Sequence, residues 1–119
     1  MRFAAVFIVS SLGLLGCADD GRPPVPYNVT AETGGGAAEL RWSYKAAPAL
    51  DCFLIQRSEG FNYNFVDLAK SPANRLNYYD ADVAVGETYY YRVAAFYKEW
   101  NGEKDVMSRF SPEVSVKIE

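Results

Sequence analysis

Apolar and polar residues alternate in many short segments of this chain after Cys17, and no segment there shows a sustained helical period. Leu40 and Trp42, for example, fall on one face of their segment while Glu39 and Arg41 fall on the other. A side-chain period of two is typical of β-strands that bury one face, whereas helices repeat every 3.6 residues. The segments with this pattern, or with a matching excess of aromatic and β-branched residues, are 38–44, 52–57, 89–97 and 114–118.

Glycine- and proline-rich turn signals separate these segments. They fall at 34–36, 47–49, 59–60, 71–74, 86 and 101–102. About seven short strands at such spacing, without helices, are typical of an antiparallel β-sandwich. We therefore predict an all-β fold of this kind.

Composition excludes several classes of function. The chain has 119 residues, a formal charge of −3 and no histidine, which fits one domain. Without histidine the commonest general base is missing, and no Ser-His or Cys-His nucleophile can form. We predict no catalytic residue, no metal site and no cofactor, so the protein is not expected to be an enzyme. A mildly acidic chain is also a poor partner for nucleic acid, whose affinity comes mostly from Lys and Arg.

The first sixteen residues have the layout of a signal peptide. Arg2 provides a positive charge, and residues 3–15 form an uncharged apolar stretch. This stretch is too short to cross a bilayer as a helix, which takes about 20 apolar residues, but it suits the apolar part of a signal peptide. We therefore predict a cleaved leader over 1–16.

The end of this stretch, Leu14-Leu15-Gly16-Cys17, resembles the lipobox of bacterial lipoproteins. The resemblance implies cleavage before Cys17, a diacylglycerol on its sulfur and acylation of its new amino group. Stable membrane anchoring takes more than one acyl chain, and such a residue carries two or three. Ala18, where Asp would favour the inner membrane, implies the outer membrane in an organism that has one. The predicted location is thus the cell envelope, with the membrane as partner through Cys17; the alternative is an ordinary secretory signal peptide.

The residues after Cys17 are expected to link the lipid to the domain. Residues 17–25 include a polar run rich in Pro and Gly, which is typical of an extended tether. The domain itself is predicted over 26–119. If Cys17 carries lipid, Cys52 has no disulfide partner and is expected to be a small buried hydrophobic residue. If Cys17 is not lipidated, a Cys17–Cys52 disulfide is the alternative in an oxidising compartment.

Residues 24–119 resemble a fibronectin type III domain, especially in the bacterial extracellular branch of that family. The most specific stretch is Tyr79-Asp80-Ala81-Asp82-Val83-Ala84-Val85-Gly86-Glu87-Thr88-Tyr89-Tyr90-Tyr91-Arg92-Val93-Ala94-Ala95. Further matches are Pro26–Ala31, Leu40–Trp42, Phe53–Ser58 and Ser108–Pro112. The resemblance implies an immunoglobulin-like sandwich of about seven antiparallel strands. An immunoglobulin domain proper is disfavoured, because the tryptophan here lies on the second strand and the usual disulfide is absent.

The same resemblance assigns structural roles. Tyr89 is expected to form a tyrosine corner, with its hydroxyl bonded to the backbone near Val83, which closes the bottom of the sandwich. Trp42 is expected at the centre of the core, and Asp80 is expected to cap a turn. Further core positions are predicted for Leu40, Phe53, Ile55, Phe65, Tyr79, Tyr91, Val93 and Ala95.

The aromatic residues outnumber what the core requires, and some are candidates for ligand binding. Trp100 and Asn101 lie in a polar hairpin loop, which the family resemblance makes a frequent recognition site. Tyr90 and Phe96 are expected to face outward on a strand, where aromatic side chains can anchor a partner. The alternative for Trp100 is that it folds back over the end of the sandwich.

Two other aromatic groups are expected to be structural. The alternation in 61–65 predicts an edge strand whose outward aromatic residue covers the sheet edge; the alternative is that Phe61 or Tyr63 belongs to a binding site. Arg92 is expected to stack with Tyr90 near Gln56 on the sheet face. The predicted function is therefore binding of an envelope protein or glycan. The alternative is a spacer or assembly subunit of an envelope complex with no ligand of its own.

Overall fold

The computed structural model describes residues 6–7, 21–45 and 47–119. The predicted lipidation site Cys17, and most of the predicted leader, lie outside the described residues. Within the described ranges there is no helix of the length and apolarity needed to cross a membrane.

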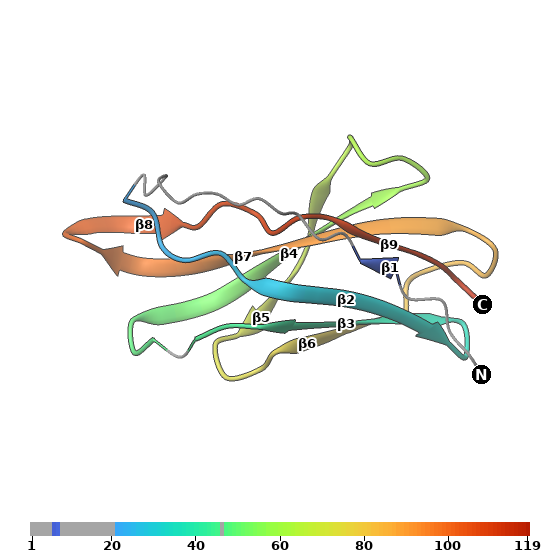
Figure 1. Cartoon of the computed structure of the whole chain (residues 1–119), viewed down its shortest axis with the longest axis horizontal. Coiled ribbons are helices and arrows are strands. Elements are labelled where there is room, and N and C mark those ends of the chain that lie inside the picture. The colour runs from blue at the N-terminus through green and yellow to red at the C-terminus, as the bar shows by residue number, and fades with distance from the viewer. Residues whose placement is uncertain (1–5, 8–20, 46) are drawn as a thin grey trace.

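Two antiparallel sheets pack face to face, as Figure 1 shows. The smaller sheet has the order β2-β3-β6 and the larger has the order β1-β9-β7-β4-β5, with β8 also paired to β7. The predicted all-β sandwich is confirmed. The strands are β1 (Val6–Phe7), β2 (Tyr27–Gly34), β3 (Ala37–Ser43), β4 (Leu50–Glu59), β5 (Val66–Pro72), β6 (Asn77–Asp80), β7 (Thr88–Trp100), β8 (Glu103–Met107) and β9 (Val114–Lys117).

The last strand of the sandwich is split into β8 and β9, both of which pair with β7. Two buried serines carry the hydrogen bonding across the gap. The hydroxyl of Ser108 accepts from the Ala95 N–H at 2.8 Å, and the hydroxyl of Ser111 accepts from the Val93 N–H at 3.0 Å. The two serine N–H groups return hydrogen bonds to the Ala95 and Val93 carbonyls, each at 2.8 Å. The backbone of β7 therefore stays satisfied where its neighbour leaves the sheet.

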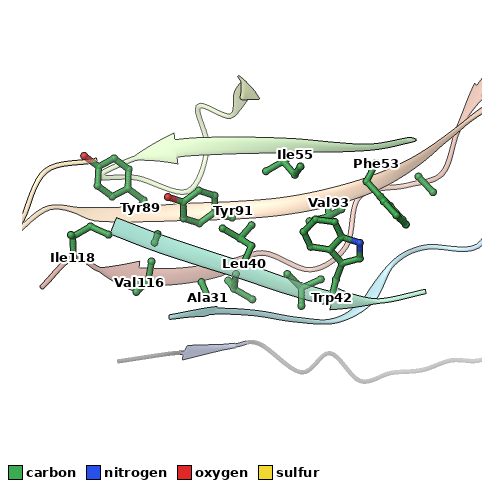
Figure 2. Close-up of a cluster of buried hydrophobic side chains, with 14 of the residues drawn as sticks. Ala31, Leu40, Trp42, Phe53, Ile55, Tyr89, Tyr91, Val93, Val116 and Ile118 are labelled. Atoms are coloured by element: carbon green, nitrogen blue, oxygen red, sulfur yellow. The ribbon is translucent and has the colours of Figure 1, made fainter. Parts of the chain in front are cut away.

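The core lies between the two sheets, and Trp42 is buried in it beside Phe53 (Figure 2). Trp42 is thus a core residue, although it lies toward one end of the cluster and not at the predicted centre. The Trp42 ring meets Phe53 edge to face, with ring centroids 5.3 Å apart. This geometry is favoured between aromatic rings. Other buried members of the core include Ala31, Leu40, Ile55, Tyr89, Tyr91, Val93, Ala95, Val116 and Ile118.

The tyrosine corner is also confirmed. The Tyr89 hydroxyl accepts a 2.9 Å hydrogen bond from the N–H of Ala84, and half-buried Val83 packs against the core. Asp80 caps the preceding turn as expected, since its Oδ1 accepts from the N–H of Asp82 at 3.1 Å. These bonds fix the connection between β6 and β7.

Two predicted core residues lie elsewhere. Tyr79 is 61% exposed, because it pairs with Glu39 in register while its neighbour Tyr78 pairs with buried Leu40. Successive side chains of a strand point to opposite faces, so only one of the two tyrosines can face the core. Phe65 is half-buried and stacks on Arg92 instead of entering the core.

The predicted edge strand over 61–65 is a loop, and β5 begins only at Val66. Gly60, with φ of 76°, turns the chain out of β4 in the left-handed region that glycine adopts readily. β5 is the outermost strand on its side of the larger sheet, and its register with β4 is irregular between Ile55 and Gln56.

Candidate binding surfaces

The β7–β8 hairpin presents two of the predicted binding residues. Trp100 ends β7 and pairs with Glu103, the first residue of β8. Between them, Asn101 and Gly102 have φ of 53° and 85°. Asn-Gly with both residues left-handed is the favoured two-residue hairpin turn, so the sequence itself specifies this loop.

Trp100 is half-buried at this end of the sandwich. Its ring meets Tyr97 edge to face at 4.8 Å between centroids. Its indole N–H donates a 2.9 Å hydrogen bond to the carbonyl of Gly21. The open recess beside it has a volume of about 390 Å³ and is lined by Gly21, Arg22, Pro24, Trp100 and Asn101. The indole N–H of Trp100 therefore already has a hydrogen-bond acceptor within the chain and does not point to a ligand.

The N-terminal segment 21–26, which we call the docked segment, lies along the domain. Pro23 and Pro26 are buried, and the Tyr44 hydroxyl donates to the Pro24 carbonyl at 3.0 Å. The hydroxyls of Tyr44 and Tyr97 lie 2.7 Å apart. Because Tyr44 has one hydroxyl proton and gives it to Pro24, Tyr97 is the donor in that second bond.

Burial of the Tyr44 ring, together with its hydrogen bond to Tyr97, raises the pKa of Tyr44 above its ordinary value. The Tyr44 hydroxyl therefore stays protonated at neutral pH and keeps its hydrogen bond to the docked segment. The described part of the predicted tether, residues 21–25, is thus in contact with the sandwich.

Tyr90 and Phe96 both lie on β7 and face away from the core, as predicted, but each is half-buried. Phe96 pairs in register with Cys52 on one side and Met107 on the other, and Tyr90 pairs with Ser58 and Ser115. Six residues along a strand separate the two rings by about 20 Å. The predicted binding residues Trp100, Asn101, Tyr90 and Phe96 therefore do not form one site.

Arg92 occupies the outer sheet face between those rings. Its guanidinium carbon lies 4.1 Å from the ring centroid of Phe65 and 4.5 Å from that of Phe110. Its Nε also donates to Gln56 Oε1 at 2.9 Å. The predicted cation–π stack is present and has Gln56 beside it, but its rings are Phe65 and Phe110 instead of Tyr90. Loop residues that approach from outside the strands supply both rings, which strand alternation cannot indicate.

The loop between β4 and β5 carries the most exposed aromatic pair among the described residues. Phe61 is 59% exposed and Tyr63 is 76% exposed, with ring centroids 5.3 Å apart. We call these two residues the ring pair. Sequence alternation assigned them to an edge strand, and Gly60, followed by asparagines at 62 and 64, is the signal for a loop.

Three hydrogen bonds hold this loop in place. The Gly60 N–H donates to the Thr88 carbonyl at 2.9 Å, and the Asn64 N–H donates to the Ser58 hydroxyl at 3.3 Å. Asn62 Nδ2 donates to the carboxylate of Glu113 at 3.0 Å. The ring pair is therefore displayed by an ordered loop, which reduces the entropy that a partner must remove on binding.

No cluster of Cys, Asp or Glu side chains suited to a metal ion occurs among the residues that the structure describes. Cys52 is buried and free.

The arrangement of β2-β3-β6 against β9-β7-β4-β5, joined through a tyrosine corner, defines a fibronectin type III fold. Solved structures agree. A Fn3-like protein from Clostridium thermocellum is 29% identical, with a TM-score of 0.59 over 79% of this chain and 91% of that chain. The fn3 domain of human contactin 1 is 11% identical, with a TM-score of 0.58 over 92% of this chain and 91% of that chain. No protein-family model matches the sequence, and neither does any curated protein. This fold supports a role as a binding or structural module.

Proposed function

We propose that the protein is a lipid-anchored module of the cell envelope whose single fibronectin type III-like domain binds an envelope protein or glycan. The lipobox-like residues Leu14–Cys17 lie just ahead of the docked segment, which begins at Gly21. A chain acylated at Cys17 would hold the sandwich directly beside the membrane.

The ring pair is the observation that carries the binding role. Phe61 and Tyr63 expose most of their surface to water, and three hydrogen bonds keep their loop in that state. Aromatic side chains are enriched among the residues that dominate binding energy, and an ordered display suits them for contact. A domain that acts only as a spacer gains nothing from exposing them.

The second candidate is a spacer or assembly subunit, which the contacts of Trp100 favour. Its indole is half-buried and bonded to Gly21, so the hairpin is closed by the protein's own chain. The two candidates differ in whether any envelope component binds the ring pair.

Retention of envelope components tests the binding role. Purified, lipidated protein is immobilised, and its retention of envelope proteins and of envelope polysaccharides from the same cells is measured separately. We expect the double variant Phe61→Ser/Tyr63→Ser to lose at least tenfold of the retention of one of these classes. Tyr79→Ser is the matched control, because Tyr79 is similarly exposed but lies on the other sheet. Equal retention by wild type and the double variant would favour the spacer.

Lipidation is tested separately by metabolic labelling with a radioactive fatty acid. We expect label in the wild-type protein and none in Cys17→Ser, together with a shift of the variant out of the detergent phase. An unlabelled wild-type protein with an unchanged membrane fraction would refute the anchor.

A further inference from the structure

We infer that the end of the sandwich formed by the β7–β8 hairpin and residues 21–24, which we call the hairpin pole, is the surface that rests on phospholipid headgroups. The ring pair is then held at the opposite end, away from the bilayer. This inference depends on the proposed lipidation of Cys17, and it adds an orientation that the anchor alone does not provide.

The first step is that the domain holds the docked segment at two backbone carbonyls. Trp100 donates to Gly21 and Tyr44 donates to Pro24, and Pro23 is buried between these two bonds. Tyr97 supports both donors, through its ring contact with Trp100 and its hydroxyl contact with Tyr44. The chain therefore reaches the domain at the hairpin pole and not at some point farther along the sandwich.

The second step is the length of chain between the lipid and this contact. Only Ala18, Asp19 and Asp20 separate Cys17 from Gly21. Four residue steps span at most about 14 Å even when fully extended. Because the acyl chains of Cys17 would enter the bilayer directly, the hairpin pole lies at the depth of the headgroups or just outside it.

The third step is the chemistry of the hairpin pole, which suits that environment. Half-buried Trp100 has an apolar ring with a polar tip, and tryptophan gathers at membrane interfaces. Tyr97 is fully buried and packs beneath the Trp100 ring. The charges at this end are mixed in sign, because exposed Glu99, Glu103 and Asp105 of the hairpin lie together with exposed Lys98, Lys104 and Arg22. Such a surface contacts headgroups without strong repulsion from anionic lipids.

The fourth step is the position of the ring pair. β4 and β7 are antiparallel, so Leu50 lies opposite Tyr97 near the hairpin pole while Glu59 lies opposite Tyr89. The nine residue steps of β4 span about 30 Å. The loop that follows Glu59 is therefore far from the hairpin. Figure 1 shows the C-terminal end of β4 well separated from the β7–β8 hairpin. An anchored domain held in this way presents Phe61 and Tyr63 outward.

Paramagnetic broadening on a membrane tests the orientation. The lipidated protein is placed in nanodiscs of phosphatidylethanolamine and phosphatidylglycerol that contain a gadolinium-chelating headgroup lipid. We expect the amide signals of Asn101 and Gly102 to broaden at least fivefold more than those of Asn62 and Tyr63. Equal broadening at the two ends, or stronger broadening at the ring pair, would overturn the inference.

Variants show whether the docked segment sets the orientation. Trp100→Phe/Tyr44→Phe removes both donors and keeps both rings, so the fold is retained and the fivefold difference is expected to vanish. Tyr63→Phe is the control, because it also removes a hydroxyl but leaves the docked segment untouched, and it should behave as wild type. If the double variant keeps the fivefold difference in broadening, the hydrogen bonds from Trp100 and Tyr44 do not set the orientation.

Failure of the lipid anchor gives a different result. If Cys17 carries no lipid, the protein does not bind nanodiscs at all. That result refutes the proposed membrane anchoring, and the contact of the hairpin pole with headgroups is refuted with it. The docking is then still measurable in the Cys17→Ser chain without lipid, by the amide heteronuclear NOE of Gly21 and Arg22. Bound protein with equal broadening, by contrast, contradicts only the orientation.

Discussion

Tyr91 donates a 2.7 Å hydrogen bond to Oδ2 of Asp80, the same oxygen that receives Nη1 of Arg57 at 2.9 Å. Tyr91 is fully buried and Asp80 is 2% exposed. The bond joins β7 of the larger sheet to β6 of the smaller one. A charged group in the interior is tolerated only when its partners satisfy it, so this cluster ties the two sheets together at one specific place.

Removing the charge of Asp80 should therefore destabilise the domain strongly. We expect Asp80→Asn to lower the free energy of unfolding by about 3–5 kcal/mol, since it removes the buried carboxylate that pairs with the largely buried Arg57 guanidinium and leaves it the exposed carboxylates of Glu59 and Asp82. Urea denaturation measures the effect. Glu59→Gln is the matched control, because Glu59 also pairs with Arg57 but is mostly exposed, and its loss should cost less than about 1 kcal/mol. Similar losses in the two variants would contradict a buried role for Asp80.

The stability of the domain should fall at high pH. Burial and the hydrogen bond to Asp80 raise the pKa of Tyr91 above its ordinary value. The unfolded chain releases this proton near pH 10 while the folded chain retains it, so the unfolded state is stabilised relative to the folded state as the pH rises further. One such tyrosine lowers stability by about 1.4 kcal/mol per pH unit above pH 10.

The variant Tyr91→Phe isolates this contribution. The pKa of Tyr44 is also raised in the folded protein, so this residue still contributes to the loss of stability in the variant. The slope of the unfolding free energy against pH should therefore become shallower by about 1.4 kcal/mol per unit without disappearing. Urea melts at pH 9, 10 and 11 give the two slopes. Parallel slopes for wild type and variant would show that Tyr91 ionises as readily in the folded state as in the unfolded state.

Trp42 should be the most costly core residue to truncate. We expect Trp42→Ala to cost about 3–5 kcal/mol, because it leaves a large cavity among buried side chains. A domain of this kind has about 5–15 kcal/mol in total, so most of the protein should unfold at moderate temperature. Thermal melting followed by circular dichroism measures the change.

Trp42→Phe is the milder companion variant. It keeps a ring against Phe53 and removes an indole N–H that has no hydrogen-bond partner within the described structure. The loss should be about half that of Trp42→Ala or less. Normal melting of the alanine variant would contradict the position of Trp42 in the core.

Cys52 should react slowly with alkylating reagents. It is buried, and burial raises the pKa of its thiol, while the thiolate is the reactive form. We expect its alkylation by iodoacetamide at pH 8 to be at least tenfold slower in folded than in urea-unfolded protein, measured by mass spectrometry in a Cys17→Ser background. Tyr63→Cys provides an exposed comparison thiol, and equal rates at the two positions would refute the protection of Cys52.

Local sequence signals predicted much of this fold. Alternation placed Leu40 and Trp42 in the core, and Asn101-Gly102 specified the β7–β8 turn. The resemblance of residues 79–95 to a fibronectin type III domain predicted the tyrosine corner at Tyr89. Each of these features depends on residues close together in the chain.

Features that join distant segments could not be predicted in this way. Tyr79 faces solvent because of its register with β3, which the sequence of β6 alone does not specify. The partner of Trp100 lies 79 positions earlier in the chain, in a segment whose composition indicated a free tether. Phe65 and Phe110 meet Arg92 only after two loops fold over the sheet.

The outermost strand β5 bears on how copies of the protein behave when they are crowded. A bare sheet edge invites another chain to continue the sheet, but β5 carries exposed Lys70 and ends at Pro72, which has no N–H to offer. Its irregular register with β4 also disrupts the regular spacing of backbone N–H and C=O groups that a neighbouring strand would pair with. Many copies packed side by side should therefore remain separate molecules instead of polymerising along this edge.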